Sequence, residues 1–470
     1  MFHVCYFLNI FRTIHRVKRE FKNALPQEPV SSNFDLDPAF MILNNERLMI
    51  MDWKEYDNET KKWQRVFIIT TRELFNHFLQ STYVQTDATF DIASKKHFKQ
   101  FFTAHGNIQG DSYTVYPMVF AFMTDKSQKL YEKFWMMLGE EAEKHHKEFH
   151  FKFHESDFEV TAWKAVEKIF PDVKNHGCFF HLCQSIIRQV KKLQLHDEYT
   201  AYEKDGNPVY LFVKILMALA YLPAEEIPSY FNALLDRMID ECEEFPKMLD
   251  LYEHFYETYV GSETSESIYP CTFWSVFDSM QSQKTNGAAE TFHHYFQEVV
   301  AKQNPDFYYV VQELKKRIVE VQAEIQKHLD GHPTTKLKKY VKLEDTIRKI
   351  VATRSERKDP AGVLESIARN IDVNTRQSTV RVKAVEPLAS SSLQASSKSK
   401  KRKTVLSFAR KLQNKQSPIK IKNKQKKPSP MYDDEAVDDV SEQQTKKQKI
   451  EFVEAFNSSS TFKFEEQVQN

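Results

Sequence analysis

Several residue types are scarce in this sequence, and each shortage argues against a class of protein. Nine of the 470 residues are glycine, which is few for a glycine-rich dinucleotide-binding fold or a repetitive β architecture. The five cysteines have no regular spacing, so the chain fits a reducing compartment better than a disulfide scaffold. No hydrophobic run reaches the length of a membrane span. We therefore expect no membrane partner.

The N-terminus lacks the pattern of a secretory signal. Residues 1–11 are apolar, but the basic residues follow this run instead of preceding it, and no small-residue cleavage site closes it. We interpret residues 1–30 as the irregular N-terminal segment of a domain that could be truncated. Residues 1–80 are assigned to this N-terminal region.

The chain also lacks an overall excess of charge, because its net charge is +1. This balance hides an asymmetry. Residues 381–430 hold 15 Lys and Arg and one acidic residue, Glu386, a net charge of +14, so the other 420 residues carry −13. Positive charge that could bind a polyanion is thus concentrated near the C-terminus.

This C-terminal segment has the composition of a disordered tail. From about residue 373 hydrophobic periodicity is lost, which predicts disorder over 373–470, basic first and then acidic. Lys400, Lys401, Arg402 and Lys403 resemble a nuclear import signal, so we expect the protein in the nucleus. The basic run could also bind phosphate groups without sequence preference.

Residues 81–195 alternate between the periodicities of strands and helices. Strands are predicted at 83–90, 100–108, 115–123, 149–154 and 177–181, and helices at 130–145, 158–170 and 182–195. Three strands followed by alternating helices and strands is the order of a ribonuclease-H-like fold. We therefore expect an α/β protein with a mixed sheet.

The sequence changes character after residue 195. Residues 196–280 are helical and aromatic and predict an all-α insertion. A helix within 281–300 would return to the interrupted domain. Residues 301–372 then form a helical C-terminal extension, with a long amphipathic helix at 308–329.

Three acidic residues stand at informative places in this scheme. Asp87 ends the first predicted strand, Asp157 follows the fourth, and Glu290 opens the helix after the insertion. Strand ends and a neighbouring helix can converge, and three carboxylates in one pocket could hold two divalent cations for an in-line phosphodiester displacement. Magnesium suits such a site because it prefers hard oxygen ligands and keeps bound water.

Taken alone, this pattern of acids has little specificity, because the chain holds 65 Asp and Glu. Most acidic residues of a protein are solvated surface groups. Four rival ligands lie in or near the same stretches: Asp91, Asp125, Glu155 and Glu159.

Short motifs in one order link these acids to a known family. They are Asp-Ala-Thr-Phe at 87–90, Gly110 and Pro117 before an apolar run, Tyr131 and Trp135, Ser-Asp-Phe-Glu at 156–159, Ala165, Phe-Pro at 170–171, Gly-Cys-Phe-Phe-His-Leu-Cys-Gln at 177–184, and Thr-Asn-Gly-Ala-Ala-Glu-Thr-Phe-His at 285–293. Over about residues 80–300, and more loosely to about 370, the sequence resembles the Mutator-like element (MULE) transposase family. Many matches in one order are more specific than any single match.

The resemblance implies a DDE transposase with a ribonuclease-H-like catalytic domain. Asp87, Asp157 and Glu290 would be its catalytic carboxylates and would bind two Mg2+ or Mn2+ ions. The reaction would be cleavage and strand transfer of transposon ends, with double-stranded DNA as partner, self-association as a further expectation, and no small-molecule substrate. Four residues would support the active site: Cys178, His181, Asn286 and His293.

Two other metal sites remain open from the residue pattern. Cys178 and His181 have the spacing of half a zinc site, although no second pair follows at suitable spacing. Glu290 and His293 form a Glu-x-x-His motif of the kind found in di-iron bundles, with a second copy at 143–146 in a densely charged run that looks solvated. A buried thiol beside a satisfied imidazole is the structural alternative for the first pair.

The aromatic residues near 274 also allow two interpretations. Phe273, Trp274 and Phe277 could stack on an unpaired base. Aromatic residues at such spacing are more often part of a core, and we favour that interpretation.

One departure from the family pattern keeps other functions open. Family members usually carry a zinc-coordinating DNA-binding module before the catalytic domain, whereas residues 1–80 hold one cysteine, Cys5. A domesticated or decayed transposase that binds DNA in the nucleus without catalysis is therefore the second hypothesis. An unrelated metal-dependent nuclease of the same fold is the third.

Overall fold

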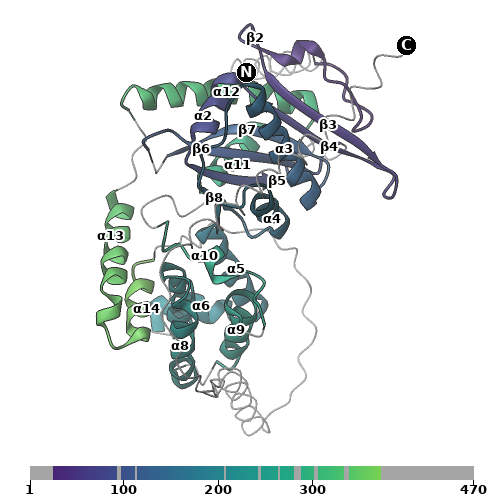
Figure 1. The fold of residues 1–470 in the computed structure, drawn as a ribbon. Helices are drawn as coiled ribbons and strands as arrows, with labels where there is room; N and C mark the ends of the chain where they lie inside the picture. The colour runs from purple at the N-terminus through teal and green to yellow at the C-terminus, as the bar shows by residue number, and fades with distance from the viewer. Residues whose placement is uncertain are drawn as a thin grey trace, which may run out of the picture. The chain divides into compact units, whose positions relative to one another are not determined.

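The computed structural model describes residues 25–371, except for 93–96, 112–113, 206–207, 242–244, 263–264, 280–286, 301–304 and 333–337. It has a mixed α/β architecture around a seven-stranded sheet of order β3-β4-β7-β6-β5-β8-β9 (Figure 1). This result confirms the expected α/β class and the mixed sheet. The predicted tail at 373–470, the import signal at 400–403 and Asn286 lie outside the described residues.

Three antiparallel strands form the centre of the sheet: β5 (Tyr83–Thr89), β6 (Gln100–Asn107) and β7 (Val115–Met123). β6 and β7 are buried along their whole length, which accounts for the nearly continuous apolar run of β7. Successive side chains of β6 serve opposite faces of the sheet. Phe101 contacts Phe296, whereas Phe102 contacts Phe134.

Helices cover both faces of this sheet (Figure 1). Trp135 stacks on Phe78 on one face, and Phe292 packs against Phe120 on the other. These contacts belong to one continuous hydrophobic cluster, which we call the sheet core. The first face carries α2 (Arg72–Gln80), α3 (Gln128–Lys144) and α4 (Val160–Ile169), and the second carries α11 (Gly287–Val300) and α12 (Phe307–Leu329).

The two parallel strands begin and end at other residues than the sequence predicts. β8 is Phe153–Ser156, and β9 is Lys174–Gly177. The strand at 149–154 was predicted from alternating Phe residues. In the structure Phe149 and Phe151 pack their rings against Trp135, and strand pairing starts only at Phe153. The expected strand at 177–181 is wrong because α5 (Phe179–Lys192) already begins there.

A hairpin extends the sheet before residue 81, where we expected the domain to begin. β3 (Met49–Asp57) pairs with β4 (Lys62–Thr70), and β4 pairs with β7. Arg65 is fully buried at the start of the apolar run of β4, where it forms an ion pair with Asp52 at 2.7 Å. The predicted N-terminal region therefore contributes two strands to the central sheet.

The described residues between 196 and 279 form helices joined by loops, with one isolated bridge between Ser262 and Ser265. They build a second hydrophobic cluster, the helical core, together with α5 and the last two helices. The C-terminal extension is thus divided, because α12 joins the sheet core and α13 and α14 join the helical core. The helices are α6 (His196–Asp205), α7 (Pro208–Ala218), α8 (Ile227–Glu241), α9 (Lys247–Phe255), α10 (Cys271–Trp274), α13 (Lys338–Ala352) and α14 (Pro360–Ala368), with a π-helical turn at Tyr256–Val260.

The aromatic residues near 274 belong to the helical part of the protein. Trp274 is fully buried, and its indole N–H donates to the Tyr259 carbonyl at 2.8 Å. Phe273 is also buried, against Trp163 and Phe158. The core interpretation is therefore correct for these two residues.

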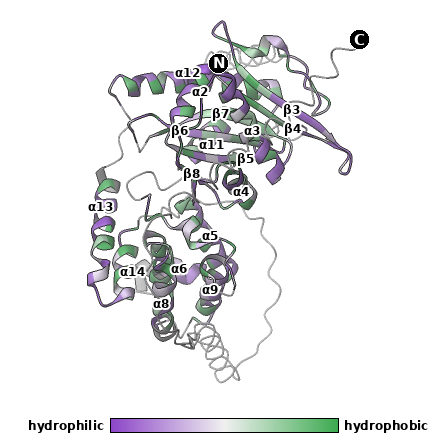
Figure 2. Ribbon diagram, viewed as in Figure 1, coloured by the Kyte–Doolittle hydropathy of each residue, from purple (hydrophilic) through white to green (hydrophobic). Residues whose placement is uncertain are grey.

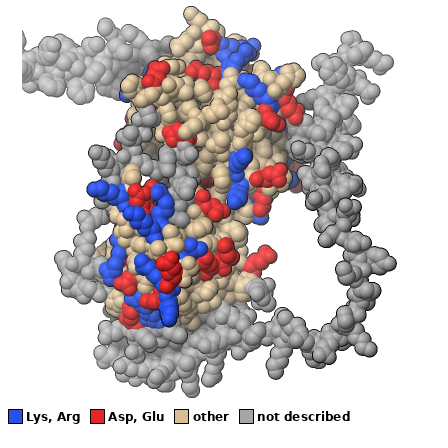
Figure 3. Space-filling view, turned by 60° about the vertical axis from the view of Figure 1, so that its left-hand side comes forward, with Lys and Arg blue, Asp and Glu red and all other residues tan. Residues whose placement is uncertain are grey.

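The helices of both cores carry hydrophobic and hydrophilic residues side by side, as amphipathic helices do (Figure 2). Lys and Arg gather over the lower part of one face, interspersed with acidic residues (Figure 3). Arg237 and Arg369 form ion pairs with Glu365, and Arg354 does so with Glu226. Among the described helices, none is long and apolar enough to cross a membrane.

Candidate active site

The register of the parallel strands brings Asp87 and Asp157 together. β5 and β8 pair in parallel, with Tyr83 opposite Phe153 and Gln85 opposite Glu155. The same offset places Asp87, near the end of β5, beside Asp157, which directly follows β8. Because the carboxyl ends of parallel strands share one edge, two residues distant in sequence meet there.

β9 adds a third strand end to the same edge. Ser156 pairs with Gly177, and the Cys178 amide donates to the Ser156 carbonyl at 2.8 Å. Cys178 therefore lies beside Asp157, where β9 gives way to α5. Its thiol is fully buried.

Glu290 reaches this edge from α11, where it stands in the first helical turn. The convergence of the three acids is visible in their electrostatics. Burial and the negative charge of Asp87 raise the pKa of Asp157 to about 6. Burial, Asp87 and Asp157 raise the pKa of Glu290 to about 8. A cation among these carboxylates would offset this repulsion.

A chain of hydrogen bonds orients the Asp87 carboxylate. His293 Nδ1 lies 2.9 Å from Asp87 Oδ2, and His293 Nε2 lies 2.9 Å from Thr103 Oγ1. Thr103 stands opposite Asp87 in the β5–β6 ladder and also contacts His105 Nε2 at 3.0 Å. The sequence motifs identify His293 but miss Thr103 and His105, whose i, i+2 spacing on one strand face was the available signal.

α11 is attached to β5 at a second point. Gln297 Nε2 donates to Thr89 Oγ1 at 2.9 Å. Glu290, His293 and Gln297 thus all turn toward the end of β5, as their spacing on one helical face predicts. These contacts hold the first three turns of α11 against the strand that carries Asp87.

Cys178 and His181 meet Glu290 rather than a second Cys/His pair. His181 Nε2 lies 3.4 Å from Glu290 Oε1. One ligand atom from each of Cys178, His181 and Glu290 lies within 4.8 Å of the other two. The sequence places all three residues at the site but does not predict them as one group of metal ligands, because Glu290 comes from a helix more than a hundred residues away.

The four rival acids are exposed or hydrogen-bonded to other groups. Asp91 is exposed, and Asp125 accepts a hydrogen bond from the Ser127 amide at 2.7 Å. Glu159 accepts from Tyr131 and Thr161. Glu155 is fully buried and accepts a hydrogen bond from the Tyr83 hydroxyl, and burial raises its pKa to about 8.

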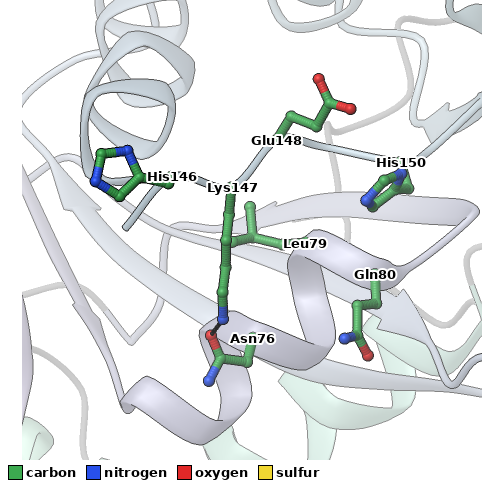
Figure 4. Close-up of a pocket in the computed structure, with 7 residues that line it drawn as sticks. All are labelled: Asn76, Leu79, Gln80, His146, Lys147, Glu148 and His150. Atoms are coloured by element: carbon green, nitrogen blue, oxygen red, sulfur yellow. Dashed lines mark hydrogen bonds between the residues drawn. The ribbon is translucent and has the colours of Figure 1, made fainter. Parts of the chain in front are cut away.

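The second Glu-x-x-His copy does not join the site. Glu143 and His146 are exposed at the end of α3, in the charged run expected to be solvated. His146 lines a separate surface pocket of about 450 Å3 (Figure 4). None of the predicted site residues lines that pocket, which is formed by Asn76, Leu79, Gln80, His146, Lys147, Glu148 and His150.

Comparison with known proteins supports one family. Residues 83–185 match the family model described as the MULE transposase domain. The matched segment runs from β5 into α5 and includes Asp87, Asp157, Cys178 and His181, whereas Glu290 lies beyond it. A search of curated proteins found no match.

Proposed function

The chain carries a MULE transposase domain at residues 83–185, and we propose that it is a DNA transposase of the DDE type. Its substrates would be double-stranded transposon ends and a DNA target, and its reactions phosphodiester cleavage and strand transfer. The observation that carries the proposal is the convergence of Asp87, Asp157 and Glu290, whose negative charges act on one another.

The order of elements supports a ribonuclease-H-like assignment for this domain. β5, β6 and β7 are followed by α3, β8, α4, β9 and α5, that is, three strands and then alternating helices and strands. In open α/β sheets ligands bind outside the carboxyl ends of the parallel strands. Asp87 and Asp157 stand at such ends.

The donor set fits a pair of divalent cations. Three carboxylates offer the hard oxygen atoms that Mg2+ and Mn2+ prefer. Glu290 Oε1 is buried and accepts no hydrogen bond within the described part of the chain. Asp87, Asp157 and Glu290 would hold the cations, which would activate the attacking oxygen and offset charge on the leaving oxygen.

The residues around Asp87 would keep its carboxylate in one orientation during this reaction. Burial holds the pKa of His105 well below its usual value, so its imidazole is neutral at pH 7. The hydrogen bonds are all satisfied if His105 Nε2–H donates to Thr103, the Thr103 hydroxyl donates to His293 Nε2, and His293 Nδ1–H donates to Asp87. Such outer partners orient metal ligands.

The helical insertion lies close enough to take part in DNA binding. The Tyr269 hydroxyl donates to the Phe158 carbonyl at 2.8 Å, next to Asp157. Burial, Tyr259 and Asp157 together raise the pKa of Tyr269, as expected for a phenol near a carboxylate. We therefore assign to residues 196–280 a role in covering the site and holding DNA.

The basic tail would act separately from the site. Residues 381–430 would bind DNA through counterion release, so this binding should weaken steeply with salt. Lys400, Lys401, Arg402 and Lys403 would direct nuclear entry. A reporter fused to residues 395–430 should accumulate in the nucleus, and a cytoplasmic reporter would reject this role.

The catalytic proposal is tested with the purified full chain, candidate transposon ends and either Mg2+ or Mn2+. Asp87→Asn should abolish cleavage and strand transfer while DNA binding through the tail persists. Asp91→Asn is the matched control and should retain activity, because Asp91 is exposed. Equal inactivity of wild type and Asp87→Asn would favour a non-catalytic DNA-binding protein derived from a transposase. Equal activity would remove Asp87 from the metal site.

A further inference from the structure

We propose that Cys178, His181 and Glu290 form a binding site for a thiophilic divalent cation, with Zn2+ as the natural occupant, beside the two aspartates. The observation is geometric, because one ligand atom from each residue lies within 4.8 Å of the other two. This site is distinct from the proposed Mg2+ or Mn2+ pair and shares only Glu290 with it.

The three donors come from elements that are anchored independently. Cys178 follows β9 and is tied by its amide to β8. His181 lies three residues further along, in the first turn of α5, whose apolar face belongs to the helical core. Glu290 comes from α11 in the sheet core. The site therefore joins the two cores of the molecule.

The chemistry of the donors favours zinc over magnesium. A thiolate, an imidazole and a carboxylate are common zinc ligands, at bond lengths of about 2.3, 2.0–2.1 and 2.0–2.2 Å. Tetrahedral geometry with these bonds requires ligand atoms about 3.3–3.6 Å apart. No two of these atoms therefore need to approach by more than about 1.5 Å.

Two polar atoms here support a ligand. His181 Nδ1 and Glu290 Oε1 are buried, and neither has a hydrogen-bond partner within the part of the chain that the structure describes. Buried polar atoms are normally satisfied. The Cys178 thiol donates a hydrogen bond to the Glu155 carboxyl, and a bound cation would take the place of that thiol proton on sulfur.

Because the zinc site and the proposed Mg2+ or Mn2+ site share the Glu290 carboxylate, zinc should affect catalysis. This consequence rests on the proposed transposase reaction. Glu290 cannot bind Zn2+ and the pair of catalytic cations equally well, so zinc should inhibit the Mg2+-dependent reaction. Three protein ligands also leave a fourth position on zinc for water. Zinc binding itself does not depend on the proposed function.

The test uses the full chain, stripped with a chelator and titrated with Zn2+ against a chromophoric competitor. Co2+ serves as a spectroscopic probe, because a cysteine ligand adds a sulfur-to-cobalt charge-transfer band. We expect Cys178→Ser and His181→Gln each to weaken zinc binding by about 100-fold or more, above the 10–100-fold typical of outer partners. Cys178→Ser should also remove the charge-transfer band.

Two controls separate this proposal from its alternatives. Cys183→Ala changes a buried thiol on the same helix and should keep both zinc affinity and the band. Asp157→Asn should change zinc affinity by no more than a few-fold, because Asp157 acts on Glu290 only through its charge. It should remove Mg2+-dependent cleavage, so failure of either proposal is seen separately. Thermal melts establish that each variant is folded. Unchanged zinc affinity in folded Cys178→Ser and His181→Gln overturns the site.

Discussion

The two sides of the candidate site are held in different ways. On the ordered side, His293 and Thr103 connect Asp87 to the neighbouring strand through contacts of 2.9 Å. On the open side, Glu290 faces His181 at 3.4 Å, and Glu290 Oε1 is buried without a hydrogen bond from any described residue. Neighbouring side chains therefore hold the Asp87 carboxylate in one orientation, whereas no described residue holds Glu290 Oε1 by a hydrogen bond.

The largest effect should come from removing a carboxylate between the two sides. Asp157→Asn should lower cleavage and strand transfer by about 1,000-fold, since loss of a metal ligand costs several kcal/mol of transition-state stabilisation. Initial rates on a labelled transposon end measure this change. Asp125→Asn, at a helix-capping position near α3, is the control and should keep most of the activity. A drop of less than tenfold for Asp157→Asn would contradict its place in the site.

The ordered side is tested next, through His293. His293→Gln should weaken activation by Mn2+ by about 10–100-fold, the usual cost of losing an outer partner of a metal ligand. The measurement is the Mn2+ concentration for half-maximal rate, which should rise more than the rate at saturating Mn2+ falls. His294→Gln is the matched control, because His294 is exposed on the same helix. Equal effects in both variants would reject the orienting role.

The raised pKa values of two acids at the site predict that the stability of the cation-free protein depends on pH. Burial and the neighbouring carboxylates raise the pKa of Asp157 to about 6 and that of Glu290 to about 8. An acid whose pKa is higher in the folded state stabilises folding when protonated, so the contribution of these two acids to the free energy of unfolding should fall as pH rises from about 4 to 8.

Melting temperatures at pH 5 and pH 8, with and without Mg2+, measure this effect. Mg2+ should stabilise the protein more at pH 8 than at pH 5, because the carboxylates must ionise to bind it. Glu290→Gln should flatten the fall in stability between these values. Equal stabilisation by Mg2+ at both pH values would contradict the assignment of these acids to a cation site.

The smallest effect is expected at the contact between the insertion and the site. Tyr269→Phe removes the hydroxyl that donates to Phe158 and should lower stability by about 1 kcal/mol. We expect the rate of cleavage to fall only a few-fold, since the aromatic ring still packs against Phe158. Chemical denaturation and the cleavage assay measure the two changes. An unchanged rate with lowered stability would restrict residues 196–280 to a structural role.

The three central strands could be predicted because β7 is a buried apolar run and because β5 and β6 are short segments rich in β-branched and aromatic residues. β5, β6 and β7 lie within a residue or two of the expected ranges. The prediction of a strand at 149–154 was wrong. Alternating Phe residues show the same sequence pattern when their rings pack under a helix as when they belong to a paired strand. Local periodicity does not distinguish these cases.

The features that could not be predicted from the sequence depend on long-range contacts. The sequence motifs single out Asp87, Asp157 and Glu290 as candidate site residues, and in the structure the charges of these three groups act on one another. Thr103 was missed because its i, i+2 spacing with His105 gains a meaning only when the strand opposite Asp87 is known. The division of the C-terminal extension between two cores likewise depends on tertiary packing, since α12 and α13 are both amphipathic.

The most direct test of the account is to locate Mn2+ by its anomalous scattering in crystals of the full chain. The account predicts Mn2+ bound by carboxylate oxygens of Asp87, Asp157 and Glu290, with His293 still bonded to Asp87. Crystals of Asp157→Asn should show weaker or missing peaks. Wild-type crystals soaked in Mn2+ that show no peak among these three carboxylates, with Mn2+ bound elsewhere, would contradict the central claim.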